Sequence, residues 1–473
     1  MIHRDSPGLC VLPIPSPVTA QEACQALQDA SHPFLLDSGM QIGNLGRYSF
    51  VGADPFLTIR AKGDQVEIET EEGVERRIAD PLAVLAELLD RYACLRGPEA
   101  AEWPFAAGAV GYLSYDLCHL IERLPRTAID DIVMPDLYFG FYDTALAFDH
   151  GTGACAAIAV DVGRGDCEGR ARKLAEIAAQ TTDRALESAP TGPGGAVVEA
   201  QLRCNFNREA YERAVARAIE YIYAGDMIQV NLSQRFSADI STSAWDLYRR
   251  LRAINPAPFA AYLGFPDTQV VSASPERFLK VADGRVETRP IKGTRPRGKT
   301  PEEDARLADE LRGSAKDNAE LVMIVDLERN DIGRVCKPGS VRVPELVVLE
   351  SYPTVHHLVA TVVGELGERH GPVDLIRATF PGGSITGAPK VRAMQIIDEL
   401  EPTQRGLYTG SIGYIGFDGT MDLNIAIRTI LVRGGKAHFQ VGGGIVADSD
   451  PAAEYCETLD KGRALARALG FEI

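Results

Sequence analysis

Apolar residues in the first 150 positions fall into short runs that are separated by turn-forming residues. Runs rich in β-branched and aromatic residues, bounded by Gly, Pro, Asp or Ser, predict strands. The predicted strands lie within 34–38, 47–61, 65–70, 106–117 and 137–150. The segment ARKLAEIAAQTTDRAL at 171–186 instead predicts a helix. The first part of the chain is therefore predicted to consist mainly of short strands and turns.

The clearest boundary in this pattern is the stretch ESAPTGPGGAVVE at 187–199. Small residues together with Pro and Gly dominate it, a composition typical of linkers. It predicts a division of the chain into an N-terminal region, 1–186, and a longer C-terminal region, 200–473.

The C-terminal region opens with an amphipathic helix. Its apolar positions at helical spacing are Phe206, Tyr211, Val215, Ile219 and Ile222. Asn205 or Asn207 is the candidate cap, and Gly225 ends the helix. Strand-like runs such as MIQVNLSQRF at 227–236 and MDLNIAIRTILV at 421–432 then alternate with helices. This order predicts an α+β fold with large, mainly antiparallel sheets rather than a series of βαβ units.

Composition narrows the class of protein. A formal charge of −17 on 473 residues argues against nucleic acid and anionic membranes as partners, because both require a basic surface. The nine cysteines are isolated and form no CxxC pair, as expected in a reducing cytoplasm. The sequence shows no leader-like start and no apolar stretch of about 20 residues. We therefore expect a cytoplasmic globular protein.

Charged residues gather on one predicted helix near the C-terminus, for which Asp450 is a candidate cap and Pro451 suits the first position. The charged positions on one face are Glu454, Glu457 and Lys461. On an arbitrary helix such a stripe is usually solvated. The triplet Gly442–Gly444 just upstream favours a functional interpretation, because glycine lets the backbone approach a ligand closely.

A second pair of carboxylates, Asp317 and Glu320, is spaced i, i+3 beside an apolar helical run. Two carboxylate-bearing helices that face each other would supply oxygen ligands for Mg²⁺, which usually binds one or two carboxylates together with an anionic substrate. The spacing alone does not establish that the two helices face each other.

Three further segments carry candidate chemistry. PGGSITGAPKVRAM at 381–394 is not a nucleotide phosphate loop, because Gly387 is followed by Ala388 rather than by Lys and Ser or Thr. It predicts a glycine-rich turn into a helix with Pro389 at the first position, a candidate anion site. SASPERF contains Glu276, and RPIKGTRPRG contains Lys292. A lysine in so polar a segment is ordinarily a solvated surface residue.

Taken together, these segments resemble the chorismate-binding enzymes, a family that includes anthranilate, isochorismate, salicylate and aminodeoxychorismate synthases. The resemblance is dense from about residue 200 onward. It is carried by AGDMIQVNLSQRF, NPAPFAAYL, SASPERF, PIKGTRPRG, VDLERNDIGRV, VHHLVATV, PGGSITGAPKVRAMQIIDELEP, YTGSIGYIGF, NIAIRT, GGGIVADSDP and ETLDKGRA. It implies an α/β sandwich of two interleaved halves with large antiparallel sheets and an active site in the cleft between them.

The resemblance also implies roles for individual residues. Glu320 and Glu457 would hold Mg²⁺ on the ring carboxylate of chorismate, with Asp317 and Glu454 nearby. The residues expected to bind the substrate are Gly293, Thr294, Tyr408, Arg428, Gly442, Gly443, Gly444 and Lys461.

Three residues are the implied catalytic groups. His357 matches an active-site histidine of the family, and Glu276 matches the acid that assists loss of the 4-hydroxyl group. Position 292 separates the chemistries, because anthranilate, isochorismate and salicylate synthases typically carry Ala there. Lys292 resembles the aminodeoxychorismate synthase branch, in which the amine attacks C2, the 4-hydroxyl leaves, and ammonia enters at C4 as the lysine departs. A neutral amine near pH 7 needs its pKa lowered by roughly three units from about 10.4, which burial and cationic neighbours can supply.

The ammonia is expected to come from a partner. No cysteine lies in the glycine-flanked strand-to-helix turn that a glutaminase nucleophile needs, so a separate glutamine amidotransferase subunit is expected. Two alternatives remain: an anthranilate synthase component I, which uses the same substrate, metal and ammonia but releases pyruvate, and a catalytically inactive subunit that senses tryptophan.

Large subunits of the family often have a tryptophan pocket in the N-terminal half, and FLLDSG, GRYS and NPAPF match it here. The candidate tryptophan-binding residues are Ser38, Leu45, Gly46, Arg47, Tyr48, Pro258, Phe259 and Ala260. Asp37 departs from the LLES pattern of anthranilate synthases. Whether tryptophan binds, as an inhibitor or as a structural ligand, is left open by the sequence.

Overall fold

Two twelve-stranded sheets dominate the computed structural model, which describes residues 8–15, 18–41, 45–93, 103–180, 201–352 and 355–473. The predicted linker, 187–199, lies outside the described residues. The first sheet has the spatial order β1 (Leu9–Pro13), β10 (Ala154–Val160), β9 (Thr144–Asp149), β3 (Tyr48–Gly52), β2 (Phe34–Asp37), β13 (Phe259–Phe265), β14 (Thr268–Ser274), β23 (Thr429–Arg433), β24 (Lys436–Ile445), β12 (Gln229–Asp239) and β11 (Arg203–Cys204), and β20 (Gly387–Ala388) also pairs with β12. The second has the order β17 (Ile291–Pro296), β19 (Val355–Glu365), β16 (Arg285–Arg289), β15 (Arg277–Ala282), β22 (Met421–Asn424), β21 (Ser411–Gly416), β7 (Gly108–Leu113), β8 (Leu137–Tyr142), β4 (Leu57–Lys62), β5 (Gln65–Thr70) and β6 (Gly73–Ile78), and β18 (Arg342–Ser351) also pairs with β19.

Both sheets combine strands from the two ends of the chain. In the first sheet β2 pairs with β13, and in the second β7 pairs with β21, in each case antiparallel. The predicted α+β fold with large antiparallel sheets and interleaved halves is therefore confirmed.

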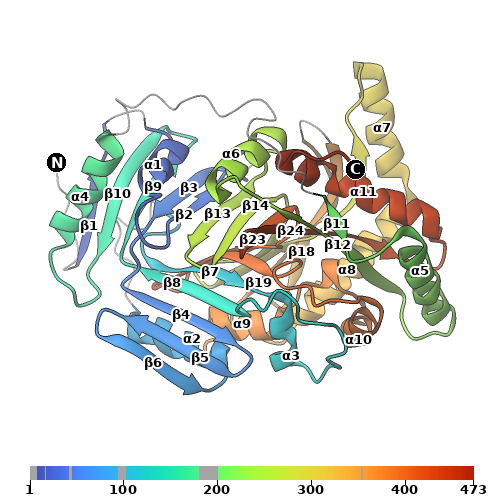
Figure 1. The fold of residues 1–473 in the computed structure, drawn as a ribbon, viewed down its shortest axis with the longest axis horizontal. Helices are drawn as coiled ribbons and strands as arrows, with labels where there is room; N and C mark the ends of the chain where they lie inside the picture. The colour runs from blue at the N-terminus through green and yellow to red at the C-terminus, as the bar shows by residue number, and fades with distance from the viewer. Residues whose placement is uncertain (1–7, 16–17, 42–44, 94–102, 181–200, 353–354) are drawn as a thin grey trace.

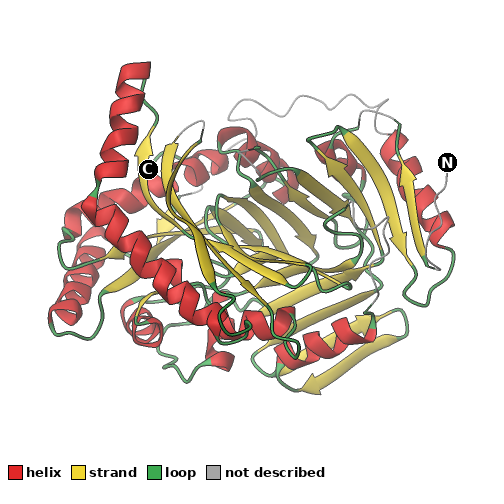
Figure 2. Ribbon diagram, turned by 180° about the vertical axis from the view of Figure 1, so that it is seen from behind, coloured by secondary structure: helices red, strands yellow, loops and turns green. Residues whose placement is uncertain are grey.

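Helices cover the outer face of each sheet (Figure 1 and Figure 2). The first sheet carries α1 (Ala20–Ala26), α4 (Cys167–Gln180), α6 (Ala244–Ile254) and α11 (Pro451–Leu469). The second carries α2 (Pro81–Arg91), α8 (Ala315–Gly333) and α9 (Pro372–Thr379). The remaining helices are α3 (Cys118–Ile121), α5 (Arg208–Tyr223), α7 (Pro301–Gly313), α10 (Lys390–Leu400) and the 3₁₀ turns Tyr115–Leu117 and Gly383–Ile385. None of the described helices is long and apolar enough to cross a membrane.

An aromatic cluster joins the inner faces of the sheets. Phe34 and Phe265 from the first sheet meet Tyr112, Tyr138 and Tyr142 from the second, and the rings of Phe34 and Tyr142 pack edge to face at 4.6 Å. Burial of each large apolar side chain contributes roughly 1.5–3 kcal/mol, so this layer fixes the two sheets against each other.

Helix starts were predicted well where the cap is local. Asn207 rather than Asn205 caps α5, and its Oδ1 accepts a hydrogen bond from the N–H of Ala210 at 2.8 Å. Asp450 caps α11 in the same way, with Pro451 at the first position, as predicted. The prediction for Pro389 was wrong by one residue: its backbone is extended, with ψ 141°, so α10 begins at Lys390.

The predicted strand 421–432 is in fact two strands in different sheets. β22 belongs to the second sheet and β23 to the first, and residues 425–428 cross between them. Arg428 has φ 51°, a left-handed conformation that interrupts an extended chain. Within β24, the pairing with β23 covers Lys436–Phe439 and stops before the triplet Gly442–Gly444. The triplet therefore pairs with β12 on one side and, within the described chain, with no strand on the other. This opening leaves glycine backbone groups available to a ligand.

Candidate active site

Lys292 lies on β17, the strand at the edge of the second sheet. Its side chain is half-buried, and Nζ donates a hydrogen bond to the carbonyl oxygen of Ser384 at 3.0 Å. Burial lowers the pKa of Lys292, while the negative charges of Glu320 and Glu276 act in the opposite direction. This environment favours a neutral, nucleophilic amine more than a surface position would.

Glu276 lies in the turn between β14 and β15 and is only 5% exposed. Its Oε1 accepts a hydrogen bond from the hydroxyl of Ser384 at 2.7 Å. Burial raises the pKa of Glu276 to about 7, although Ser384 and Lys292 both lower it. The carboxyl group is therefore substantially protonated near neutral pH and can act as an acid.

Ser384 was not predicted as a site residue, yet it contacts both groups. It lies in the 3₁₀ turn Gly383–Ile385, inside the segment that the sequence marked only as a glycine-rich turn. It is 92 residues from Lys292 and 108 from Glu276, so no local spacing could have revealed the contacts.

The carboxylates of α8 and α11 lie close enough to influence each other's pKa. The pKa of Glu320 is raised first by burial and also by the negative charges of Asp317 and Glu457. Glu457 Oε1 lies 2.6 Å from Lys461 Nζ, which also donates to the carbonyl oxygen of Gly442 at 2.9 Å.

Glu454 completes this group of acidic side chains. It is buried, and its Oε1 accepts a hydrogen bond from Ser449, while its Oε2 has no hydrogen-bond partner among the described residues. A side chain at Gly443 would place Cβ 2.8 Å from that Oε2, so glycine lets the strand pass directly beside the carboxylate. Among the described residues, no group of three or more His, Cys, Asp and Glu side chains is close enough to hold a metal ion by itself. Glu320 and Glu457, with the unpartnered oxygen of Glu454 nearby, nevertheless fit Mg²⁺, which takes its other ligands from substrate and water.

Two cations beside the glycines can receive an anionic substrate. Arg428 donates a hydrogen bond to the carbonyl oxygen of Lys461, which ties the crossover between the sheets to α11. Burial lowers the pKa of Arg428, and the nearby Tyr408 acts in the opposite direction. Tyr408 and Arg428 therefore lie close together.

His357 lies on β19 opposite Thr294 of β17. Its Nδ1 is 3.0 Å from Thr294 Oγ1 and 3.3 Å from the carbonyl oxygen of Gly293. Burial lowers the pKa of His357 to about 4, so the ring is neutral at pH 7. The predicted catalytic, metal and substrate-binding residues therefore converge on one region from both sheets and from α8 and α11.

The predicted tryptophan pocket is a separate cavity of about 460 Å³. All eight predicted residues, Ser38, Leu45, Gly46, Arg47, Tyr48, Pro258, Phe259 and Ala260, line it. Asp37 also lines it, but its carboxylate accepts hydrogen bonds from the hydroxyl of Tyr248 at 2.6 Å and from Arg252. The negative charge of Asp37 is thus already paired with Arg252.

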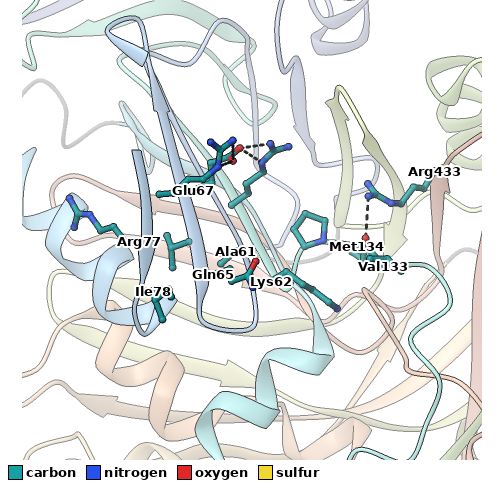
Figure 3. Close-up of a pocket in the computed structure, with 13 residues that line it drawn as sticks. Ala61, Lys62, Gln65, Glu67, Arg77, Ile78, Val133, Met134 and Arg433 are labelled. Carbon is teal, nitrogen blue, oxygen red and sulfur yellow. Dashed lines mark hydrogen bonds and ion pairs between the residues drawn. The ribbon is translucent and has the colours of Figure 1, made fainter. Parts of the chain in front are cut away.

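A second cavity, of about 480 Å³, lies between β4–β6 and the segment 133–135 (Figure 3). Arg60 is bonded to Glu67 at 2.7 Å, and Lys62 pairs with Asp130 and Asp136 at 2.7 and 2.9 Å. Its cations are paired with carboxylates, and none of the predicted site residues lines it. The resemblance therefore assigns this cavity no part in binding the substrate.

Comparison with known proteins assigns the family. The sequence model of the chorismate binding enzyme family matches residues 32–467. The chain belongs to this family. Aminodeoxychorismate synthase component 1 of Escherichia coli is 44% identical over 90% of this chain and 91% of its own length. Anthranilate synthase component 1 of Thermus thermophilus is 45% identical over 96% and 95%. The crystal structure of anthranilate synthase component I from Streptococcus pneumoniae superposes with a TM-score of 0.78 at 33% identity, over 90% of this chain and 93% of that one.

Family membership identifies the chain as a chorismate-binding enzyme. It does not choose between the two activities, because relatives of both names are about equally similar. The choice depends on the chemistry of individual residues in the site.

Proposed function

We propose that the chain is the large component of an aminodeoxychorismate synthase, which converts chorismate and ammonia to 4-amino-4-deoxychorismate for 4-aminobenzoate and folate synthesis. One observation carries this proposal: the half-buried amine of Lys292 and the acid Glu276 are both hydrogen-bonded to Ser384. A relative of that name at 44% identity supports it.

Substrate binding is assigned to the opening beside the glycine triplet. Arg428 and Lys461 match the two carboxylates of chorismate in charge, and the backbone of Gly442–Gly444 approaches the ligand without side chains in the way. Tyr408 lies beside Arg428, and Gly293 and Thr294 are assigned to the ring. Bound Mg²⁺, held by Glu320 and Glu457, would neutralise negative charge on the substrate.

The first chemical step uses Lys292 and Glu276. Nζ of Lys292 forms a bond to C2 of the ring, the ring double bonds shift, and the C4–O bond breaks. The proton of Glu276 leaves with the hydroxyl group as water, so the carboxyl becomes a carboxylate. His357, beside Thr294, is neutral at pH 7 and so adds no positive charge that would draw the substrate carboxylates away from Arg428 and Lys461.

The second step regenerates both residues. Ammonia forms a bond to C4, the ring double bonds shift back, and the bond from Nζ to C2 breaks, which releases the neutral lysine. The surplus proton of the new ammonium group returns to Glu276. The sum of the two steps is the replacement of hydroxyl by amine, with loss of one water.

The ammonia is proposed to come from a separate glutamine amidotransferase subunit, in agreement with the word component in the names of the relatives. The cavity lined by the eight predicted residues is proposed as the tryptophan site, because all the residues that the resemblance implies for such a site line this one cavity.

The alternative is an anthranilate synthase component, favoured by the relative at 45% identity. The purified chain should be incubated with chorismate, Mg²⁺ and an ammonium salt, and the product identified by mass spectrometry while pyruvate is assayed. We expect a product that carries the new amine and keeps its enolpyruvyl group, without pyruvate. Anthranilate and pyruvate in equal amounts would assign the alternative activity instead.

A further inference from the structure

We propose that Ser384 is a positioning residue that holds the nucleophile and the acid of the reaction in one arrangement, an inference that rests on the proposed function. Lys292 and Glu276 come from different elements, β17 and the turn after β14. Both are bonded to the same serine: the amine to its carbonyl oxygen at 3.0 Å and the carboxyl to its hydroxyl at 2.7 Å.

The turn that carries Ser384 is held from several sides. Ser384 is 5% exposed, and the turn is closed by a hydrogen bond from Thr386 Oγ1 to the carbonyl oxygen of Gly382 at 2.9 Å. Arg405, itself 3% exposed, donates to the carbonyl oxygen of Ile385 at 3.2 Å. A fixed support of this kind maintains catalytic geometry with little loss of entropy at the moment of reaction.

Helix α8 supports the same turn. A Cβ at Gly383 would lie 2.7 Å from Leu327 Cδ2, so the helix that carries Glu320 packs directly against the backbone next to Ser384. Leu327 of α8 thus supports the turn from the side of the helix.

The two contacts have different chemical consequences. The hydroxyl donates to Oε1 of Glu276, which leaves Oε2 as the oxygen that carries the proton. The carbonyl accepts one N–H of a neutral Lys292 amine and so restricts the direction of its lone pair. One residue thereby orients the attacking electron pair and the transferred proton at the same time.

Other titratable groups around Glu276 come from three elements. Lys292 faces it from β17, Glu328 from α8, and Tyr352 from the turn before β19. Burial, with the nearby Glu276, raises the pKa of Glu328 to about 8, so this neighbour is largely neutral at pH 7. Ser384 donates a side-chain hydrogen bond to the Glu276 carboxyl group, and the backbone of Ile291, the residue before Lys292, also lowers the pKa of Glu276 by a hydrogen bond.

Ser384→Ala separates the two contacts, because it removes the hydroxyl and keeps the carbonyl. We expect kcat at the optimum pH to fall about tenfold, which corresponds to one lost hydrogen bond to a catalytic group, with little change in KM for chorismate. The hydroxyl stabilises the carboxylate, so its loss should move the descending limb of the pH profile about one unit higher. Ser340→Ala is the matched control, since Ser340 is also buried and hydrogen-bonded but lies beyond the far end of α8.

The wild-type enzyme is assayed first with chorismate, Mg²⁺ and ammonium. Failure of the wild type to aminate chorismate would contradict the proposed function, whereas a normal wild type with an unchanged Ser384→Ala variant would contradict only the role of Ser384. Melting temperatures are measured in parallel, and Ser384→Cys, which keeps the volume but donates weakly, replaces the alanine variant if that one does not fold. A loss of activity that is explained by a lower melting temperature, with the pH limb unmoved, also overturns the proposal.

Discussion

Replacing Glu276 by Gln keeps the size of the side chain and removes the proton that we assign to the departing hydroxyl group. Glu276 is 5% exposed, and burial raises its pKa to about 7. The wild-type acid is therefore about half protonated at pH 7 and about one-tenth protonated at pH 8, so the rate should fall about tenfold per pH unit above 7. General acid catalysis typically contributes about 10²- to 10⁴-fold, and kcat of Glu276→Gln should fall by that factor.

The assay is chorismate consumption between about pH 5.5 and 9, with saturating ammonia corrected for its own ionisation. The pH profile of Glu276→Gln should lack the descending limb, and its kcat should be lower at every pH. The amide oxygen of the glutamine still accepts the hydrogen bond from Ser384. Glu365→Gln is the control, because Glu365 is exposed at the end of β19. A Glu276→Gln enzyme within about threefold of the wild type, or a wild-type rate that stays constant above pH 8, would refute the assignment.

Four further predictions follow from the same geometry. Glu457→Gln should abolish turnover that depends on Mg²⁺ and leave the melting temperature nearly unchanged, whereas the exposed Glu472→Gln should behave like the wild type; normal activity in excess chelator would contradict the metal assignment. The pure chain should not turn over chorismate with glutamine in place of ammonium, and glutamine-dependent activity without a second subunit would contradict the need for a partner. Tryptophan at about 100 times its Kd should stabilise the fold by about 2.7 kcal/mol, measured as a shift in Tm that phenylalanine does not reproduce, and no shift at high concentration would leave the cavity without this ligand. Arg405→Met should lower the free energy of unfolding by about 3–5 kcal/mol, because it leaves the buried Glu401 without its cation, while Arg217→Met at an exposed pair should have little effect; equal denaturation midpoints would contradict this ranking.

The predictable part of the fold was the local part. The caps Asn207 and Asp450 bond to backbone groups three residues away, so the sequence around them contains the whole interaction. The division of 421–432 into β22 and β23 was not predictable in this way, because it depends on which strands the two halves meet in opposite sheets.

The candidate site shows the same contrast between local and long-range information. Lys292 and Glu276 were identified because their motifs resemble a family, and no periodicity would have found them. Ser384 was missed because its partners are 92 and 108 residues away and only the folded chain brings them together. The tryptophan-pocket residues, also taken from the resemblance, do line one cavity, since β2 and β13 pair directly.

The most direct test of the central claim is the intact mass of the enzyme after incubation with chorismate and Mg²⁺ in the absence of ammonia. We predict an added mass equal to chorismate minus water, mapped by peptide analysis to Lys292, absent in Lys292→Ala, and discharged as 4-amino-4-deoxychorismate when ammonium is supplied. An enzyme that stays unmodified throughout and releases pyruvate and anthranilate on addition of ammonium would contradict the account.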